Sequence, residues 1–153
     1  MKKITLALLS IFMLSSCSSA VSFNSVNDGD IITAKISGQT FDFLTVKSPQ
    51  ARAKGLSGRT ELPENGMIFF FEWPQALTFW MKDMHFAIDI VWVKDNKVVG
   101  ISRDLKPQPE AEDKDLNIYS SFALANIAIE LNAGDAKKYN IEPGQKIKFK
   151  RNK

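Results

Sequence analysis

Cysteine and histidine are almost absent from this chain of 153 residues, which contains only Cys17 and His85. A sole cysteine excludes an intramolecular disulfide, so the fold has to be held by its hydrophobic core. If Cys17 is modified, no thiol remains to act as a nucleophile or to bind a metal ion. With His85 as the only imidazole, a serine triad is not expected, and neither a metal site nor a cofactor is predicted.

A large excess of one sign of charge is also lacking. The chain has 20 Lys and Arg against 17 Asp and Glu, and Lys2 and Lys3 belong to an N-terminal segment that we expect to be removed. A nucleic-acid partner is therefore not predicted, because such proteins concentrate basic residues on one face. The one basic cluster alternates with apolar residues, as in the exposed face of a terminal strand, and comprises Lys146, Lys148, Lys150, Arg151 and Lys153.

No apolar run is long enough to span a bilayer as a helix, which takes about 20 residues. The apolar run at the N-terminus, over residues 4–14, follows two lysines and precedes Ser15-Ser16-Cys17. Basic residues, a short apolar stretch and small residues in this order are typical of a secretory signal, predicted here over residues 1–16.

The residues Leu14-Ser15-Ser16-Cys17 resemble the lipobox of bacterial lipoproteins, in which the cysteine is acylated and becomes the new N-terminus. The alternative is an ordinary signal peptide with a cysteine that falls near its cleavage site by chance. Two or more acyl chains on Cys17 hold a protein firmly on a membrane, since each buried methylene contributes about 0.8 kcal/mol. We therefore expect a membrane-anchored protein of the cell envelope that faces the periplasm, and Ser18 after the cysteine favours the outer membrane.

The remainder divides into two parts. Residues 17–30 are small and polar apart from isolated apolar residues, and they are predicted to be the lipidated cysteine and a flexible tether. Residues 31–153 are predicted to form one domain, because short β-rich runs alternate there with turn residues. The expected strands are 31–36, 40–46, 67–71, 77–81, 87–93, 97–102, 127–131 and 145–150. The predicted fold class is mainly β (a β-rich α+β fold), as a small barrel or sandwich with one or two short helices.

One helix has clear boundary signals. Ser48 suits the N-cap, Pro49 the first turn and Gly55 the stop, so a short helix is predicted between them. A second helical turn is expected over residues 135–139. The short, continuously apolar run 67–71 is typical of a strand that is buried on both faces.

A series of motifs runs through the domain in order: Arg52, Gly55-Leu56-Ser57-Gly58-Arg59, Leu62-Pro63, Gly66 to Phe71, Phe79-Trp80-Met81-Lys82, Asp89-Ile90, Tyr119, Glu130-Leu131-Asn132-Ala133-Gly134 and Gly144. This series, over roughly residues 33–150, resembles the DUF192 family, also called UPF0127. The resemblance implies a compact β-rich domain, often exported, with no agreed activity, cofactor or partner. The family's usual Asn-Thr and Ile-Pro-Leu-Asp after the Phe-Trp-Met-Lys motif are replaced here by Asp83-Met84 and Phe86-Ala87-Ile88-Asp89.

Two acidic residues, Asp89 and Glu130, stand in strands that are otherwise apolar. Alternation places Asp89 on the face of its strand opposite Ile88 and Ile90, and Glu130 on the face opposite Ile129. An unpaired buried charge costs several kcal/mol, so each acid needs a partner or a proton. Structural ion pairs inside a small barrel are one reading of these acids.

The other reading is functional, with five residues lining one charged, aromatic-walled cleft: Arg52, Trp80, Lys82, Asp89 and Glu130. Such a cleft suits a small polar ligand, for example a glycan, a peptide end or a small anion. We favour a non-enzymatic binding or accessory module. The alternative is a hydrolase of envelope glycans that uses Asp89 and Glu130 as a carboxylate pair. A third possibility is contact with an envelope protein through the loop 106–115.

Overall fold

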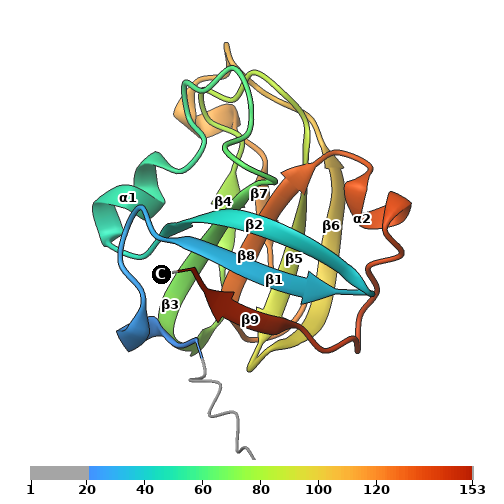
Figure 1. Cartoon of the computed structure of the whole chain (residues 1–153). Helices are drawn as coiled ribbons and strands as arrows, with labels where there is room; N and C mark the ends of the chain where they lie inside the picture. The colour runs from blue at the N-terminus through green and yellow to red at the C-terminus, as the bar shows by residue number, and fades with distance from the viewer. Residues whose placement is uncertain (1–20, 153) are drawn as a thin grey trace, which may run out of the picture.

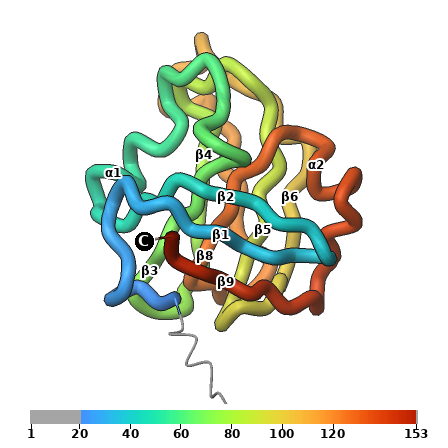
Figure 2. Tube along the Cα trace, viewed as in Figure 1, coloured from blue at the N-terminus to red at the C-terminus, as the bar shows by residue number. Residues whose placement is uncertain are grey.

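A computed structural model describes residues 21–152 of the chain (Figures 1 and 2). The predicted signal segment 1–16 and the predicted lipidation site Cys17 lie outside the described residues. No helix within the described part is both long and apolar enough to cross a membrane.

The predicted β-rich fold is confirmed. The strands are β1 (Ile31–Ile36), β2 (Gln39–Val46), β3 (Met67–Gln75), β4 (Thr78–Trp80), β5 (Ile88–Lys94), β6 (Lys97–Leu105), β7 (Ile118–Ser120), β8 (Ala125–Asn132) and β9 (Lys148–Arg151). The helices are α1 (Pro49–Lys54) and α2 (Asp135–Lys138), with short 3₁₀ turns η1 (Phe23–Ser25) and η2 (Asp113–Asp115).

Seven strands form one curled sheet in the order β6-β5-β8-β3-β2-β1-β9, and β4 and β7 form a separate antiparallel pair. Within the large sheet only β2 and β3 run parallel. The curl brings the chain before β9 back to the β6 edge, where Ile147 N donates to Asn96 O at 2.8 Å and Val98 N donates to Gln145 O at 2.9 Å. The sheet is therefore a half-barrel that nearly closes on itself (Figure 1).

Apolar side chains cover both faces of the sheet, which is why the strand 67–71 is continuously apolar. The first core cluster includes Ile68, Phe70, Val91, Val93, Ile127, Ile129 and Leu131. The second core cluster, on the opposite face, includes Met67, Phe69, Ile88, Ile90, Trp92 and Ala128. The central strands β3, β5 and β8 contribute alternate residues to the two clusters, as the period of two in a strand requires.

Helix α1 begins and ends where the sequence predicts. Ser48 Oγ accepts a hydrogen bond from Ala51 N at 3.2 Å, and Pro49 occupies the first turn. Gly55 ends the helix with a φ of +44°, and its N–H donates to Ala51 O. This positive φ is accessible to glycine at little steric cost. The end of α1 also shapes the cavity described below, because the turn at Gly55 forms part of its lining.

The segment 21–30 differs from the flexible tether expected over residues 17–30, because it packs against the domain. Val21 and Val26 are 8% and 1% exposed and belong to the first core cluster. Asp28 accepts a hydrogen bond from Ser48 N at 3.0 Å, and Gly29 N donates to Thr45 O at 2.9 Å. The isolated apolar residues of this segment are core residues, so the described part of the predicted tether is structural.

Candidate functional site

A cavity of about 340 Å³ lies on the face of the sheet that carries the second core cluster. Its lining comes from α1 and the turn after it (Arg52, Ala53, Lys54, Gly55, Leu56, Ser57), from β3 (Phe69, Phe71), from β4 (Thr78, Phe79, Trp80), and from Met84, Ile118 and Glu130. Arg52, Trp80 and Glu130, which lie far apart in the sequence, are thus brought together by the packing of α1 and β4 against this face.

Glu130 is the buried polar group of this cavity. Its strand, β8, lies between β3 and β5, where Glu130 is paired with Met67 on one side and Ile90 on the other. The side chain is 5% exposed, and Oε2 has no hydrogen-bond partner among the described residues. A buried polar atom without a partner is uncommon in a folded protein and requires an explanation.

Burial raises the pKa of Glu130 from its usual 4.5 to about 8, because the apolar surroundings penalise the charged form. The side chain is therefore mostly a neutral carboxylic acid at pH 7. In this form it has one O–H donor in addition to its acceptor oxygen. Glu130 thus offers a hydrogen-bond donor to whatever enters the cavity.

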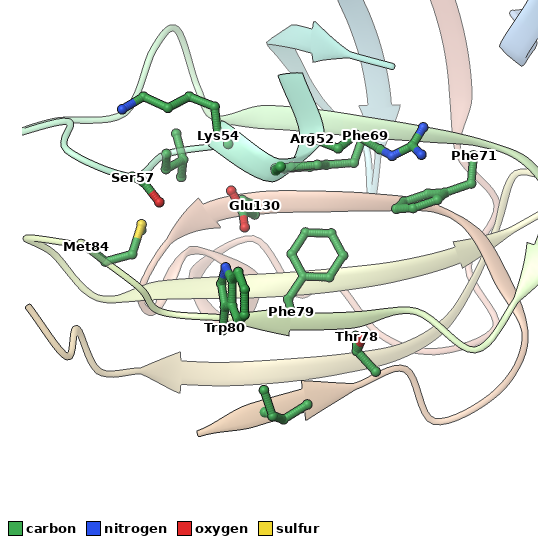
Figure 3. Close-up of a pocket in the computed structure, with 14 residues that line it drawn as sticks. Arg52, Lys54, Ser57, Phe69, Phe71, Thr78, Phe79, Trp80, Met84 and Glu130 are labelled. Atoms are coloured by element: carbon green, nitrogen blue, oxygen red, sulfur yellow. The ribbon is translucent and has the colours of Figure 1, made fainter. Parts of the chain in front are cut away.

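Aromatic rings form the walls around this acid (Figure 3). Phe79 packs edge-on against Phe69, with 4.9 Å between the ring centroids, and against Trp92 at 5.3 Å. These contacts fix Phe79 as a rigid wall. Trp80 is 47% exposed, so its indole stands at the rim where it can cover a bound molecule.

Arg52 lies at one end of the cavity. Its Nη1 donates to the carbonyl oxygens of Lys47 and, at 3.2 Å, of Phe70, while the guanidinium carbon lies 4.5 Å from the centroid of the Phe71 ring. Burial lowers the pKa of Arg52 below its usual range, and the charge of Asp28 opposes this effect. Lys54 lies at the opposite end of the cavity in Figure 3. Among the described residues, the charged side chains that line the cavity besides Glu130 are thus two cations, Arg52 and Lys54.

Lys82 is adjacent to the cavity but does not line it. Its ammonium forms an ion pair with Asp113, and this hydrogen bond raises the pKa of Lys82. The same Nζ lies 5.9 Å from the centroid of the Trp80 ring. Lys82 is therefore a neighbour of Trp80, and its ammonium charge is already paired with Asp113. Its contact with a ligand stays a prediction.

The prediction that Asp89 belongs to this cleft is wrong. Asp89 is fully buried on the other face of the sheet, and its Oδ2 accepts hydrogen bonds from Gly134 N and Ala136 N, both at 3.0 Å. Its Oδ1 accepts a third from Asp104 N at 2.8 Å. The carboxylate thus connects the start of α2 to β6. Its partners are backbone amides, so neither a salt bridge nor a ligand is needed to satisfy it.

The carboxylate pair is separated by the sheet itself. In β5 and β8, Asp89 is opposite Leu131, a member of the first core cluster, and Glu130 is opposite Ile90, a member of the second. Directly opposed residues project to the same face of a sheet. Asp89 and Glu130 therefore lie on opposite faces of the sheet and share no cavity. The glycan hydrolase hypothesis required both carboxyl groups in one cavity.

The apolar lining of the cavity could not be recognised from the sequence. In the sequence, Phe69, Phe79 and Met84 have the pattern of ordinary core residues, and they border an open space because of how elements far apart in the chain pack around them. Among residues 21–152, no group of three His, Cys, Asp or Glu side chains is arranged to hold a metal ion.

Comparison with known proteins gives a family and two similar structures. The model of DUF192, described as an uncharacterized ACR, matches residues 32–149, and a prokaryotic membrane lipoprotein lipid attachment site matches residues 1–18. A search of curated proteins found no match.

Two crystal structures share the fold. One is a "putative transcription regulator" from Sinorhizobium meliloti 1021, with 25% identity, a TM-score of 0.68, and coverage of 81% of this chain and 97% of that one. The other is a protein of unknown function from Novosphingobium aromaticivorans DSM 12444, with 30% identity, a TM-score of 0.66, and coverage of 77% and 83%.

Proposed function

The chain belongs to the DUF192 family and carries a lipoprotein attachment site, and from this premise we propose that it is a membrane-tethered binding module. The proposed ligand is a small organic molecule with a flat apolar body and an acceptor oxygen, such as a carboxylate. The observation that carries the proposal is the buried, unpartnered Oε2 of Glu130 beside an aromatic-walled cavity.

The chemistry of the lining supports this class of ligand. A neutral Glu130 donates one hydrogen bond, and an acceptor oxygen on the ligand would remove the penalty of leaving that group unpaired. Arg52 and Lys54 add positive charge at the ends of the cavity, which favours an anion over a cation. The volume of about 340 Å³ falls within the roughly 300–1,000 Å³ usual for small-molecule sites.

The hydrolase alternative has less support. It needs two carboxyl groups on one bond of the substrate, and among the described residues Glu130 is the one carboxyl group that lines the cavity. A binding role needs no second acid. Anchored through acylated Cys17, the module would face the periplasm, and Ser18 favours the outer membrane over the inner one.

A matched pair of probes tests the proposal. Naphthalene-2-carboxylate and naphthalen-2-ylmethylammonium differ in the sign of their charge and share the same ring. The mature chain with Cys17→Ser, which removes the lipid and keeps every described residue, would be titrated with each probe at pH 6.5 and followed by amide NMR shifts. We expect saturable shifts around the cavity with the carboxylate and weaker ones with the ammonium.

Two variants connect the shifts to Glu130. Glu130→Leu removes the donor and should weaken binding of the carboxylate about tenfold, the equivalent of about 1.4 kcal/mol. Trp73→Ala, an exposed tryptophan outside the cavity, should leave the affinity unchanged. If Glu130→Leu binds the carboxylate as well as the unmodified chain does, Glu130 is not the recognition group.

A further inference from the structure

The lipid attachment site constrains which surface of the domain can face the bilayer. Cys17, the only cysteine of the matched attachment site, precedes the buried Val21 by four residues. A fully extended chain spans at most about 3.6 Å per residue, so Val21 lies within about 14 Å of the acylated residue in any conformation. This is less than the diameter of a domain of this size, whose radius of gyration alone is about 14 Å. The part of the domain around Val21 must therefore be the part nearest the membrane.

An exposed tryptophan lies in that part of the domain. Val21 and Phe23 border a hollow together with Glu72, and Phe23 borders the adjoining hollow together with Trp73. Trp73 is 59% exposed and lies in the second half of β3, after the fully buried residues 67–70. Figure 1 shows η1, the end of β3 and the β5–β6 turn together at one end of the molecule.

The chemistry of this surface, defined here by Phe23, Trp73 and the β5–β6 turn, suits a lipid headgroup layer. Tryptophan is enriched at membrane–water interfaces, because its ring is apolar and its N–H can remain hydrated. Charges of both signs nearly cancel in the hollow beside Trp73 and in the β5–β6 turn, with Asp28, Glu72 and Asp95 against Lys47, Arg52, Lys94 and Lys97. Attraction to anionic lipid is thus not the driving force, and neutral lipid should be sufficient.

We propose that this surface rests on the bilayer that holds the Cys17 lipid, with the indole of Trp73 inserted among the headgroups. Trp73 itself does not line the Glu130 cavity, although Arg52 and Phe71 border both that cavity and the hollow beside Trp73. The mouth of that cavity, bordered by the exposed Trp80 and Ile118, stays accessible to the solvent.

Tryptophan quenching by brominated lipid tests the proposal on the intact lipidated protein. The mature protein would be reconstituted into vesicles of phosphatidylcholine with brominated acyl chains and compared with the same protein in unbrominated vesicles. The described part of the chain has three tryptophans, of which Trp92 is fully buried while Trp73 and Trp80 are exposed. Trp73→Phe and Trp80→Phe are therefore matched variants.

We expect bromolipid to quench the unmodified protein, Trp73→Phe to lose that quenching, and Trp80→Phe to keep it. Amide NMR spectra of each variant with Cys17→Ser establish that the fold is intact. Equal quenching of the unmodified protein and Trp73→Phe would overturn the proposal. So would a loss of quenching in Trp80→Phe, or no quenching of the unmodified protein. None of these results depends on the ligand proposed for the Glu130 cavity.

Discussion

Gly66 lies so close to the carbonyl oxygen of Glu130 that a Cβ atom at position 66 would be 2.0 Å from it. The contact is between backbones, so no side-chain rotation can relieve it. Gly66 also has a φ of +148°, which side chains rarely allow. The glycine therefore lets the start of β3 approach β8 at the residue whose side chain faces the cavity.

Gly66→Ala should destabilise the protein by about 2–4 kcal/mol, because either β3 or β8 must move to admit the methyl group. Urea unfolding of the two proteins measures the difference. Gly38→Ala is the matched control, since Gly38 also has a positive φ but open space around it, and its expected loss is about 1 kcal/mol. Equal losses at the two positions would show that the close approach to Glu130 is unimportant.

The stability of the protein should depend on pH through Glu130. The folded-state pKa is about 8 and the unfolded value is near 4.5, so between these pH values the folded state holds a proton that the unfolded state has released. Stability is then fully present below about 4.5, falls as the pH rises toward 8, and levels off above it. At about 1.4 kcal/mol per pKa unit, the loss amounts to a few kcal/mol.

Glu130→Gln tests this pH dependence, because an amide does not titrate in this range. The variant should match the unmodified protein in its free energy of unfolding at pH 5 and exceed it at pH 9. Urea unfolding across the pH range gives both curves. Parallel curves would mean that Glu130 titrates alike in the folded and unfolded states.

Asp89→Asn should weaken the fold and leave the ligand site intact. The substitution replaces one acceptor oxygen by an NH₂ group in a position where Asp104, Gly134 and Ala136 all donate backbone N–H groups. The expected loss is about 2–4 kcal/mol by urea unfolding. The affinity for naphthalene-2-carboxylate should not change, which separates Asp89 from the site.

Asp104→Asn is the control for that experiment. The Asp104 side chain is 60% exposed and pairs with the exposed Lys106, an arrangement worth little in water. The free energy of unfolding of Asp104→Asn should fall by less than about 1 kcal/mol. A loss of probe affinity in Asp89→Asn, with the fold intact, would restore Asp89 to the proposed cleft.

Binding of naphthalene-2-carboxylate should weaken as the pH rises above about 8, where Glu130 loses the proton that it donates. If only the protonated form binds, the affinity falls about tenfold per pH unit well above the pKa, because the competent fraction falls by that factor. Glu130→Gln should bind with an affinity that is constant over the same range. Tighter binding at pH 9 than at pH 7 would instead identify the carboxylate as the binding form.

Local signals in the sequence predicted the local structure. The expected strands 31–36 and 40–46 appear as the antiparallel pair β1 and β2, and Ser48, Pro49 and Gly55 mark the ends of α1. These features are set by residues that are close in sequence, through turn chemistry and capping. The same holds for the alternation along β5 and β8, which correctly gave the two faces of each strand.

The composition of the site could not be predicted in the same way. Alternation shows which residues of one strand share a face, but the pairing register decides which face of β5 corresponds to which face of β8. Asp89 is opposite Leu131, so the two acids are on different faces although each was correctly placed within its strand. The burial of Val21 and Val26 was missed for the same reason, since contacts with distant strands create it.

Measurement of the pKa of the Glu130 carboxyl group decides whether the cavity contains a hydrogen-bond donor at neutral pH. The pKa can be read from the ¹³Cδ chemical shift in an NMR titration of the mature Cys17→Ser chain from pH 3 to 10, with Glu130→Gln used to assign the signal. We expect a midpoint near 8, with the acid neutral and able to donate a hydrogen bond at pH 7. A midpoint near 4.5 would contradict it, because the cavity would then present a carboxylate.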